Sequence, residues 1–466
     1  MILSRMKPFL FVLVLPFVRS LLQYLTDRAI TGILGIELMI FFVIAIFSAL
    51  SWRAFRLTVM EDAISIRSGI IFVKRATIKI SSLSSVQSEQ NIIDLLFGSV
   101  TYSINTEAGR RNKSDFRFKL YKKDSREVSR RLYGDKSHKE VKFSVLRVAI
   151  LAATTSSAFT GMIIGVPVIN KAGDLLGLAL YDMLFDEINN VSKKFTAVFP
   201  PIVNALTLIL LLGYAVSFIY SFLKYINFKL FLGDNKLEVR SGFFTRTRTS
   251  FKKDSVNNIR IEQTPIMTLV KRFAIKVSVG GYGDSKSESA VIMPCGKKME
   301  IRRRFSMYFP FLVPKGKLIY APNTLFTKSR FLFMPGVYFI LITAVSITLA
   351  LIFEDFGKLI LFSTAVILGI DLYFAYISLM ESRFGKIHLG ETVFAHSTKN
   401  LRITELYCPK ENIGEIKIHR FLTDFTQNTC RIRITVRSES ADSIRVRMLP
   451  YDEVKQEIYN CFGIKV

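Results

Sequence analysis

The residue types that most often carry out catalysis or bind metals are sparse in this chain. It has four histidines and four cysteines in 466 residues. The histidines have no Cys, Asp or Glu partner at metal-ligand spacing, and neither a GxSxG elbow nor a phosphate loop is present. The Gly-rich stretch 280–283 precedes residues without a helical pattern, so it predicts a hairpin rather than a nucleotide site. We therefore expect no enzyme, no metal and no cofactor.

Clusters of Lys and Arg are the stronger candidates for function, because Lys+Arg number 64 against 37 Asp+Glu. Each cation near an anionic leaflet contributes about 1 kcal/mol of attraction. No nucleic-acid motif accompanies the clusters, so we expect a lipid surface or a protein partner and no nucleic acid. The residues that we expect to bind are Lys74, Arg75, Arg246, Arg248, Lys252, Lys253, Arg302, Arg303 and Arg304.

The alternative for these cations is a role in membrane topology alone, since positive charge beside a membrane span sets its orientation without binding anything. For Arg246, Arg248 and Lys252 we favour surface binding. For Arg302 to Arg304, which lie at the end of their basic stretch, both interpretations stay open.

One carboxylate, Asp371, lies inside a long apolar segment. A carboxylate at that depth is costly and often marks a functional site, although an Asp that is protonated or hydrogen-bonded between helices is the alternative. A transporter or export component with Asp371 in its path is therefore the second hypothesis for function. No pair of Gly- or Pro-broken helices supports a transport path.

Long apolar segments organise the chain, half of which is hydrophobic. A bilayer span needs about 20 apolar residues. Six segments meet this length and form three pairs, and each pair precedes a polar block: block one (52–142), block two (223–328) and block three (382–466). The six predicted spans are 8–26, 32–51, 146–168, 200–222, 332–353 and 359–380. The membrane regions are thus 1–51, 143–222 and 329–381, with an amphipathic outer loop at 169–199.

The three blocks repeat. Arg67-Ser68-Gly69 aligns with Arg240-Ser241-Gly242, whereas block three carries Ala395-His396-Ser397 in that place. Alternating apolar and polar residues predict strands, and Gly69 and Gly242 fall at hairpin turns between them. Each block ends in a helical pattern, for example at 122–134 and 451–463. We therefore expect small antiparallel barrels or sandwiches, each with one terminal helix.

These motifs resemble the bacterial pleckstrin-homology (PH-like) membrane proteins of the YdbT type. The match rests on the Ser68-Gly69 turn, the basic strand after it, Val86-Gln87, Gln90 and Leu96-Phe97-Gly98. Block two matches with Ala274 in place of the last Gly, and block three matches in outline. The resemblance implies a multi-pass α-helical membrane protein with three antiparallel PH-like domains, each of seven strands and a C-terminal helix. It also implies a binding platform, in a group that has been linked with protection against membrane-active peptides.

Charge predicts the orientation of the blocks. Block one holds 19 Lys and Arg against 10 Asp and Glu, and block two holds 21 against 7, whereas the outer loop is poor in cations. By the positive-inside rule the blocks and both termini lie in the cytoplasm of a bacterial cell, beneath its inner membrane. The four cysteines lack a pairing pattern, which agrees with a reducing compartment.

The first hypothesis for function is therefore a non-enzymatic scaffold. Its blocks bind the inner leaflet, a partner membrane protein or a second copy, and so contribute to envelope integrity or to resistance to membrane-active peptides. Block three, the least basic of the three, is the block that we expect to bind protein.

Overall fold

The computed structural model describes residues 53–69, 72–106, 116–133, 139–176, 180–194, 201–279, 290–353, 356–399, 402–437 and 443–464, with isolated positions between 39 and 50. The predicted spans 8–26 and most of 32–51 lie outside these residues, as does the Gly-rich stretch 280–283.

Block one folds as two groups of three antiparallel strands and a terminal helix. The strands are β1 (Arg56–Val59), β2 (Ala63–Ser68), β3 (Lys74–Lys79), β4 (Leu83–Gln90), β5 (Ser99–Thr106) and β6 (Phe116–Tyr121). The short helix α3 (Ile92–Leu96) joins β4 to β5, and α4 (Lys122–Tyr133) follows β6. The predicted strands and the predicted end helix are thus confirmed in this block.

Block two repeats this order after a strand that comes from the preceding segment. That strand is β7 (Lys139–Lys142), which pairs with β8. The block continues with β8 (Lys229–Leu232), β9 (Lys236–Ser241), β10 (Arg246–Lys252), β11 (Val256–Gln263), α9 (Pro265–Leu269), β12 (Phe273–Val279), β13 (Ala290–Gly296) and α10 (Lys298–Tyr308). The turn from β9 to β10 needs glycine, because Gly242 has φ 105° and a Cβ there would lie 1.9 Å from the carbonyl oxygen of Thr245.

Block three follows the same pattern, and β14 (Ile319–Tyr320) precedes and pairs with its first strand. Its elements are β15 (Lys386–His388), β16 (Thr392–Lys399), β17 (Arg402–Pro409), β18 (Ile413–His419), α13 (Leu422–Thr426), β19 (Thr429–Val436), β20 (Ser443–Pro450) and α14 (Tyr451–Phe462). The predicted alignment of this block is one residue off. His396, not Ala395, takes the place of Arg240, since each lies opposite the lysine that begins its block's first strand.

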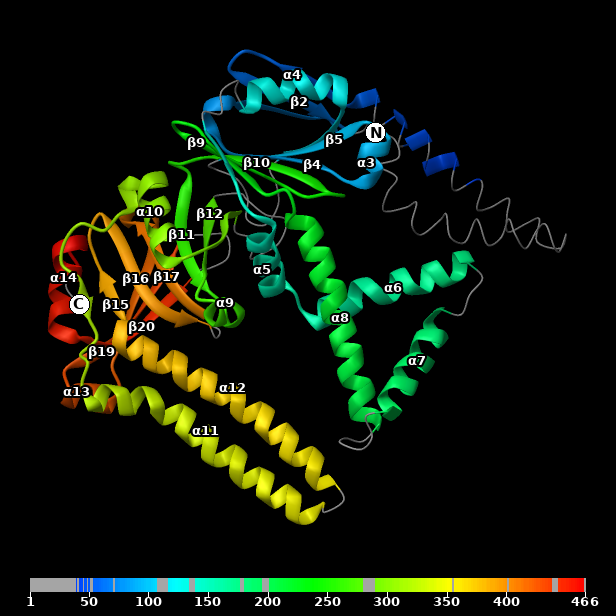
Figure 1. Ribbon diagram of the computed structural model, residues 1–466. Coiled ribbons are helices and arrows are strands. Elements are labelled where there is room, and N and C mark those ends of the chain that lie inside the picture. Colours follow the sequence, from blue (N-terminus) through cyan, green and yellow to red (C-terminus); the bar gives the residue numbers. More distant parts are fainter. Residues whose placement is uncertain are drawn as a thin grey trace.

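The blocks are joined through shared sheets, which the sequence did not predict. One seven-stranded sheet has the order β6-β5-β4-β10-β9-β8-β7 and so passes from block one into block two. A second, β13-β12-β11-β17-β16-β15-β14, passes from block two into block three (Figure 1). Two three-stranded sheets, β1-β2-β3 and β18-β19-β20, complete the described strands. Three hydrophobic cores contain Tyr102 of block one, Ile259 of block two and Ile432 of block three, and the core of block two also includes Phe394 and Tyr407 of block three.

Three helices in the described residues are long and apolar enough to cross a membrane. They are Asn204–Tyr225 within α8 (Pro201–Tyr225), Leu325–Ile352, which is α11, and Leu359–Phe384 within α12 (Gly357–Phe384). The last two run side by side away from block three as a hairpin (Figure 1). The outer loop contains α7 (Leu180–Lys194).

The predicted span 146–168 is not one continuous helix, although its two parts together are apolar enough for a broken span or a re-entrant segment. The segment is two helices, α5 (Val145–Thr155) and α6 (Ala158–Leu176), with a bend of 92° between Val145–Thr155 and Ala158–Pro167. The cause is the run Thr154 to Ser157. The hydroxyls of Thr154, Thr155 and Ser156 donate to carbonyls of the preceding turn, and the Ser157 amide donates to Ser217 of α8. Such local bonds compete with the helix ladder.

Candidate functional site: an arginine cavity at the end of a membrane helix

A cavity of about 470 Å³ lies where the C-terminal end of α12 meets the sheet β18-β19-β20. We call it the arginine cavity, because its lining contains four arginines and one carboxylate. The lining residues are Phe374, Ile377, Glu381, Thr398, His419, Phe421, Arg431, Ile432, Arg433, Arg445 and Arg447. Phe374, Ile377 and Glu381 belong to the candidate span Leu359–Phe384, so the cavity lies beside the C-terminal end of a helix that is long and apolar enough to cross a membrane.

Strand alternation explains why the arginines gather there. On β19 the buried Cys430, Ile432 and Ile434 face the block-three core, so Arg431 and Arg433 project from the opposite face. On β20 the buried Ile444 and Val446 alternate with Arg445 and Arg447 in the same way. The R-x-R pattern on consecutive strands therefore places all four cations on one face of the sheet.

The strand register brings like charges directly together. Arg433 lies opposite Arg445 on one side and opposite Lys417 of β18 on the other. Like charges in directly opposite positions of an antiparallel sheet destabilise it. Lys417 is paired with Glu415 of its own strand at 3.0 Å, so the uncompensated part of this row is Arg433 against Arg445. An anion bound over these two arginines would remove the cost of their repulsion.

One arginine is already paired. Arg447 donates to Glu381 through Nε and Nη2, at 3.2 Å from Oε1 and 2.7 Å from Oε2. The Glu381 side chain is 2 % exposed and also accepts from the hydroxyls of Ser397 and Thr398. This buried carboxylate holds Arg447 rigidly against α12 and leaves the remaining arginines without an acidic partner in the cavity lining.

Arg431 is positioned by an aromatic ring and a second carboxylate. Its guanidinium lies over the ring of Phe421, 4.3 Å from the centroid. Burial lowers the pKa of Arg431 below its ordinary value, and Asp424 opposes that shift. The buried Nε atoms of Arg431 and Arg433 have no hydrogen-bond acceptor among the described residues. Guanidinium groups match phosphate oxygens in a bidentate geometry, so the cavity is equipped for a phosphate or a carboxylate.

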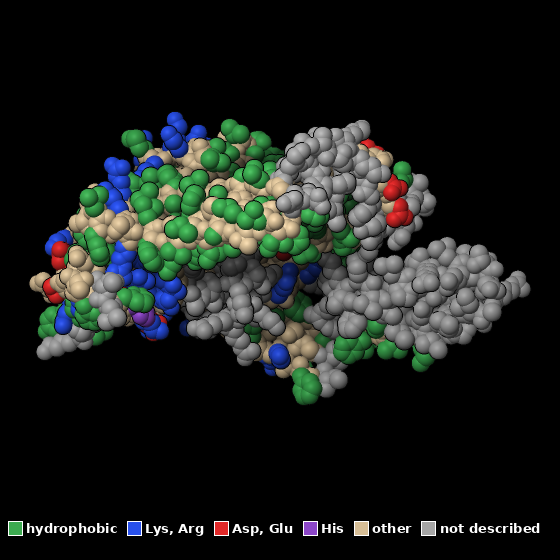
Figure 2. Space-filling view, turned by 90° about the horizontal axis from the view of Figure 1, so that it is seen from below, with side chains coloured by type: hydrophobic (Ala, Val, Ile, Leu, Met, Phe, Trp, Pro, Cys, Tyr) green, Lys and Arg blue, Asp and Glu red, His purple; other side chains and the backbone are tan. Residues whose placement is uncertain are grey.

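Lys and Arg side chains also gather on the molecular surface. Figure 2 shows Lys and Arg side chains gathered in a band that borders a broad hydrophobic surface. The band lies on the same left-hand side on which Figure 1 places block three. A charged rim beside an apolar surface is the arrangement expected of a protein at a membrane–water boundary.

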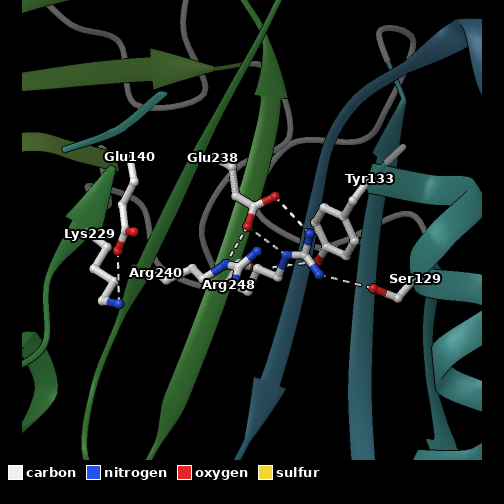
Figure 3. Close-up of polar contacts among 7 residues, drawn as sticks. All are labelled: Ser129, Tyr133, Glu140, Lys229, Glu238, Arg240 and Arg248. Carbon is white, nitrogen blue, oxygen red and sulfur yellow. Dashed lines mark hydrogen bonds and ion pairs between the residues drawn. The ribbon is translucent and has the colours of Figure 1, made fainter. Parts of the chain in front are cut away.

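The structure places Arg248, a predicted binding residue, inside the junction of blocks one and two. It donates to Glu238 at 2.7 and 2.8 Å and to the Ser129 hydroxyl at 3.0 Å, and it lies over the Tyr133 ring (Figure 3). Ser129 and Tyr133 come from α4 of block one, whereas Glu238 comes from β9. The charge of Arg248 is therefore matched within the protein.

The neighbours of Arg248 divide between the same junction and the surface. Lys252 donates to the carbonyl of Ser81 in block one, and Lys253 donates to the carbonyl of Asp234 at 2.7 Å. Arg246 is exposed at the start of β10. The basic strand of block two is thus largely part of the joint between two blocks.

The remaining predicted cations lie apart from one another. Lys74 and Arg75 are exposed on β3 of block one. On α10, Arg302 is exposed and lies 3.7 Å from Glu405 of block three, whereas Arg304 pairs with Glu300 at 3.0 Å. Arg303 is exposed. These residues do not gather into one site.

Asp371 lies within α12 and is 7 % exposed. It belongs to the same helix as Glu381, ten positions earlier and deeper in the candidate span. Sequence reasoning singled out Asp371 and missed the arginine cavity, although RIRITVR at 431–437 and SIRVRMLP at 443–450 carry its signal. Block three as a whole contains fewer Lys and Arg residues than blocks one and two. This low overall content concealed the concentration of arginines on one face of β19 and β20.

Comparison with known proteins agrees with this architecture. The chain is 19% identical over 366 residues to the UPF0699 transmembrane protein YdbT of Bacillus subtilis (strain 168), a match that spans 72% of this chain and 70% of that protein. The family model for the bacterial PH domain matches residues 10–136 and 175–306, which together make up more than half of the chain. This chain therefore belongs to the bacterial PH domain family.

Proposed function

We propose that this protein is a non-enzymatic, multi-pass membrane scaffold that binds the head group of an anionic phospholipid in the arginine cavity. The blocks lie on the cytoplasmic side of a bacterial inner membrane, with both termini on that side. Each of the three blocks serves as a PH-like domain. Head-group binding docks block three on the leaflet and thereby contributes to envelope integrity.

The observation that carries the proposal is the row in which Arg433 and Arg445 lie directly opposite each other in the cavity lining, beside the end of α12. The row is unfavourable without an anion, and it adjoins the candidate span that would bring the cavity to the level of lipid phosphates. Family membership supports a membrane-associated protein, and YdbT is itself a transmembrane protein by name.

Native mass spectrometry of the purified full chain tests this proposal. Detergent-solubilised protein is titrated with phosphatidylglycerol, with zwitterionic phosphatidylcholine as the reference lipid. The double variant Arg433→Gln, Arg445→Gln is compared with Arg56→Gln, Arg126→Gln, which removes the same charge from exposed positions on β1 and α4.

We expect the lipid-bound fraction of phosphatidylglycerol to fall at least tenfold in the cavity variant and less than twofold in the matched control. Inorganic phosphate is added in a parallel arm. Two results together would identify a site for free phosphate instead. Millimolar phosphate would displace the bound lipid, and without phosphate the protein would bind phosphatidylglycerol and phosphatidylcholine equally. Equal binding of phosphatidylglycerol by both variants would refute the cavity as the site.

A further inference from the structure

The two junctions within the chain use the same strands in the same register. At the first junction, Arg248 on β10 lies opposite Ser88 on β4. At the second, Glu405 on β17 lies opposite Ile261 on β11. Ser88 and Ile261 are equivalent, because the offset between them also aligns Glu89-Gln90 with Glu262-Gln263.

Arg248 and Glu405 are equivalent as well. Arg248 lies opposite Arg240, and Glu405 lies opposite His396. Arg240 and His396 in turn lie opposite the lysine that begins the first strand of their block, β8 or β15. Each junction therefore joins the third strand of a later block to the fourth strand of the block before it.

This rule leaves two strand edges open. The third strand of block one, β3, is hydrogen-bonded only to β2 among the described residues. The fourth strand of block three, β18, pairs only with β19 in the described structure. The outward side chains on both strands are exposed. Unpaired edges of this kind are templates for pairing with another chain.

We infer that β18 of one copy pairs with β3 of a second copy, and that the chains associate head to tail through this sheet. The edges of β3 and β18 are equivalent to the two strand edges that pair at each internal junction, β10 with β4 and β17 with β11. The inference does not depend on lipid binding by the arginine cavity.

The register of the inferred contact follows from the internal junctions. Arg75 is the block-one equivalent of Arg248, because it lies opposite Arg67 as Arg248 lies opposite Arg240. Ile418 is the block-three equivalent of Ile261 on β11. Arg75 therefore lies opposite Ile418, which places Ala76 opposite Lys417.

The basic side chains of β3 do not oppose this pairing. Lysine on a sheet edge often serves to prevent association. Here, however, β10 reads RTRTSFK and is as basic as β3, which reads KRATIK, yet β10 pairs with β4 along six residues. The inferred register also brings no two Lys or Arg residues directly opposite each other, and Glu415 lies opposite Ile78.

Membrane attachment is compatible with the contact. Blocks two and three each follow apolar helices, α8 and the α11–α12 hairpin, and are nevertheless joined edge to edge. Because the contact is heterologous, it propagates from copy to copy and forms a ring or a row rather than a closed two-fold dimer. Tethering in one membrane raises the local concentration of the two edges.

Disulfide crosslinking of the full chain in membranes tests the inference. Cys461, the native cysteine that is not fully buried, is first replaced by Ser. Two differently tagged chains, one with Ala76→Cys and the other with Lys417→Cys, are co-expressed and mildly oxidised. The mismatched control combines Lys79→Cys with Lys417→Cys, which lie three residues out of register, about 10 Å apart along the strands.

We expect a two-tag product from the matched pair at a yield at least fivefold above the mismatched pair. A single chain that carries both Ala76→Cys and Lys417→Cys should give a ladder of multimers, which a two-fold dimer cannot produce. Self-crosslinking of the Ala76→Cys chain alone would show a symmetric β3–β3 contact and overturn the inference. A matched yield no higher than the mismatched one, with both variants still melting as the parent does, would overturn it too.

Discussion

Arg248 of block two lies 3.8 Å above the ring of Tyr133 in block one, and its guanidinium also holds the buried carboxylate of Glu238. Cation–π stacking and a bidentate ion pair thus meet on one side chain at the junction of two blocks. A residue that looks like a surface cation in the sequence is a structural link in the fold.

The first prediction follows from this link. Arg248→Gln removes two of the three hydrogen bonds that Arg248 and Arg240 donate to the buried Glu238 and leaves Arg240 as its remaining ion-pair partner, so we expect a loss of about 2–3 kcal/mol of stability. The measurement is thermal unfolding of the purified chain, read by a thiol-reactive dye that reaches the buried Cys295, Cys408 and Cys430. Arg246→Gln, two residues away and exposed, is the control and should change stability by about 0.5 kcal/mol or less. Equal effects of the two variants would contradict the structural role of Arg248.

The second prediction concerns the cost of the cation row. Arg445→Gln removes one of the charges beside Arg433, so the lipid-free protein should gain up to about 1 kcal/mol of stability. In phosphatidylglycerol the order should reverse, because the parent chain then gains the energy of the bound anion and the variant gains less. Melting temperatures in detergent with and without that lipid give the answer. A variant that is less stable than the parent in both conditions would show that no uncompensated repulsion exists there.

Local patterns were enough to predict strands and turns. The alternation in AISIR and FRFKLY predicted β2 and β6, and Gly242 was predicted as a turn residue, because these features depend only on near neighbours. The shared sheets could not be predicted in this way. Pairing of β10 with β4 joins residues more than 150 positions apart. No local sequence pattern specifies which strand edges pair with each other.

The arginine cavity is hidden in the sequence for a related reason. The spacing in RIRITVR places Arg431 and Arg433 on one face of a strand, but only the register of β19 and β20 brings Arg433 opposite Arg445. The bend at Ser156 was missed because hydropathy windows average over the Ser/Thr run and do not see side chains that compete for backbone carbonyls.

The third prediction concerns pH. Glu405, at the junction of blocks two and three, lies 3.3 Å from Nδ1 of His396 and 3.7 Å from Arg302. Burial alone would raise the pKa of this carboxyl, but His396 and Arg302 outweigh burial and lower it from 4.5 to about 2. Because the folded pKa lies below the unfolded value, the stabilisation is complete above about pH 4.5 and is lost as the pH falls toward 2.

Circular dichroism melts between pH 3 and 6 check this dependence. Glu405→Gln should lower the melting temperature near neutral pH and flatten its fall across the acid range. Glu391→Gln, at an exposed position in the same block, should leave the pH profile unchanged. A profile as steep in Glu405→Gln as in the parent would assign the acid sensitivity to other groups.

The fourth prediction tests the turn between β9 and β10. Gly242→Ala introduces a Cβ 1.9 Å from the carbonyl oxygen of Thr245 at a φ of 105°, so the hairpin must shift and stability should fall by more than about 1 kcal/mol. Gly336→Ala in α11 meets no atom within 4 Å and serves as the matched control, with no loss expected. The same dye-based melt reports both variants. Tolerance of Gly242→Ala would mean that the turn has another conformation.

The fifth prediction separates a scaffold from a transporter. Asp371 is buried in α12, where a carboxylate in a proton-coupled path would have to change its protonation state. Asp371→Asn preserves the shape of the side chain and replaces one carboxylate oxygen with an amide donor. If the protein is a scaffold, both phosphatidylglycerol binding and the Ala76–Lys417 crosslink should stay within twofold of the parent. Cells that express the variant should then resist membrane-active peptides as the parent cells do. Loss of that resistance with lipid binding, crosslinking and melting temperature all unchanged would place Asp371 in a transport path, because only a function inside the membrane would then have been removed.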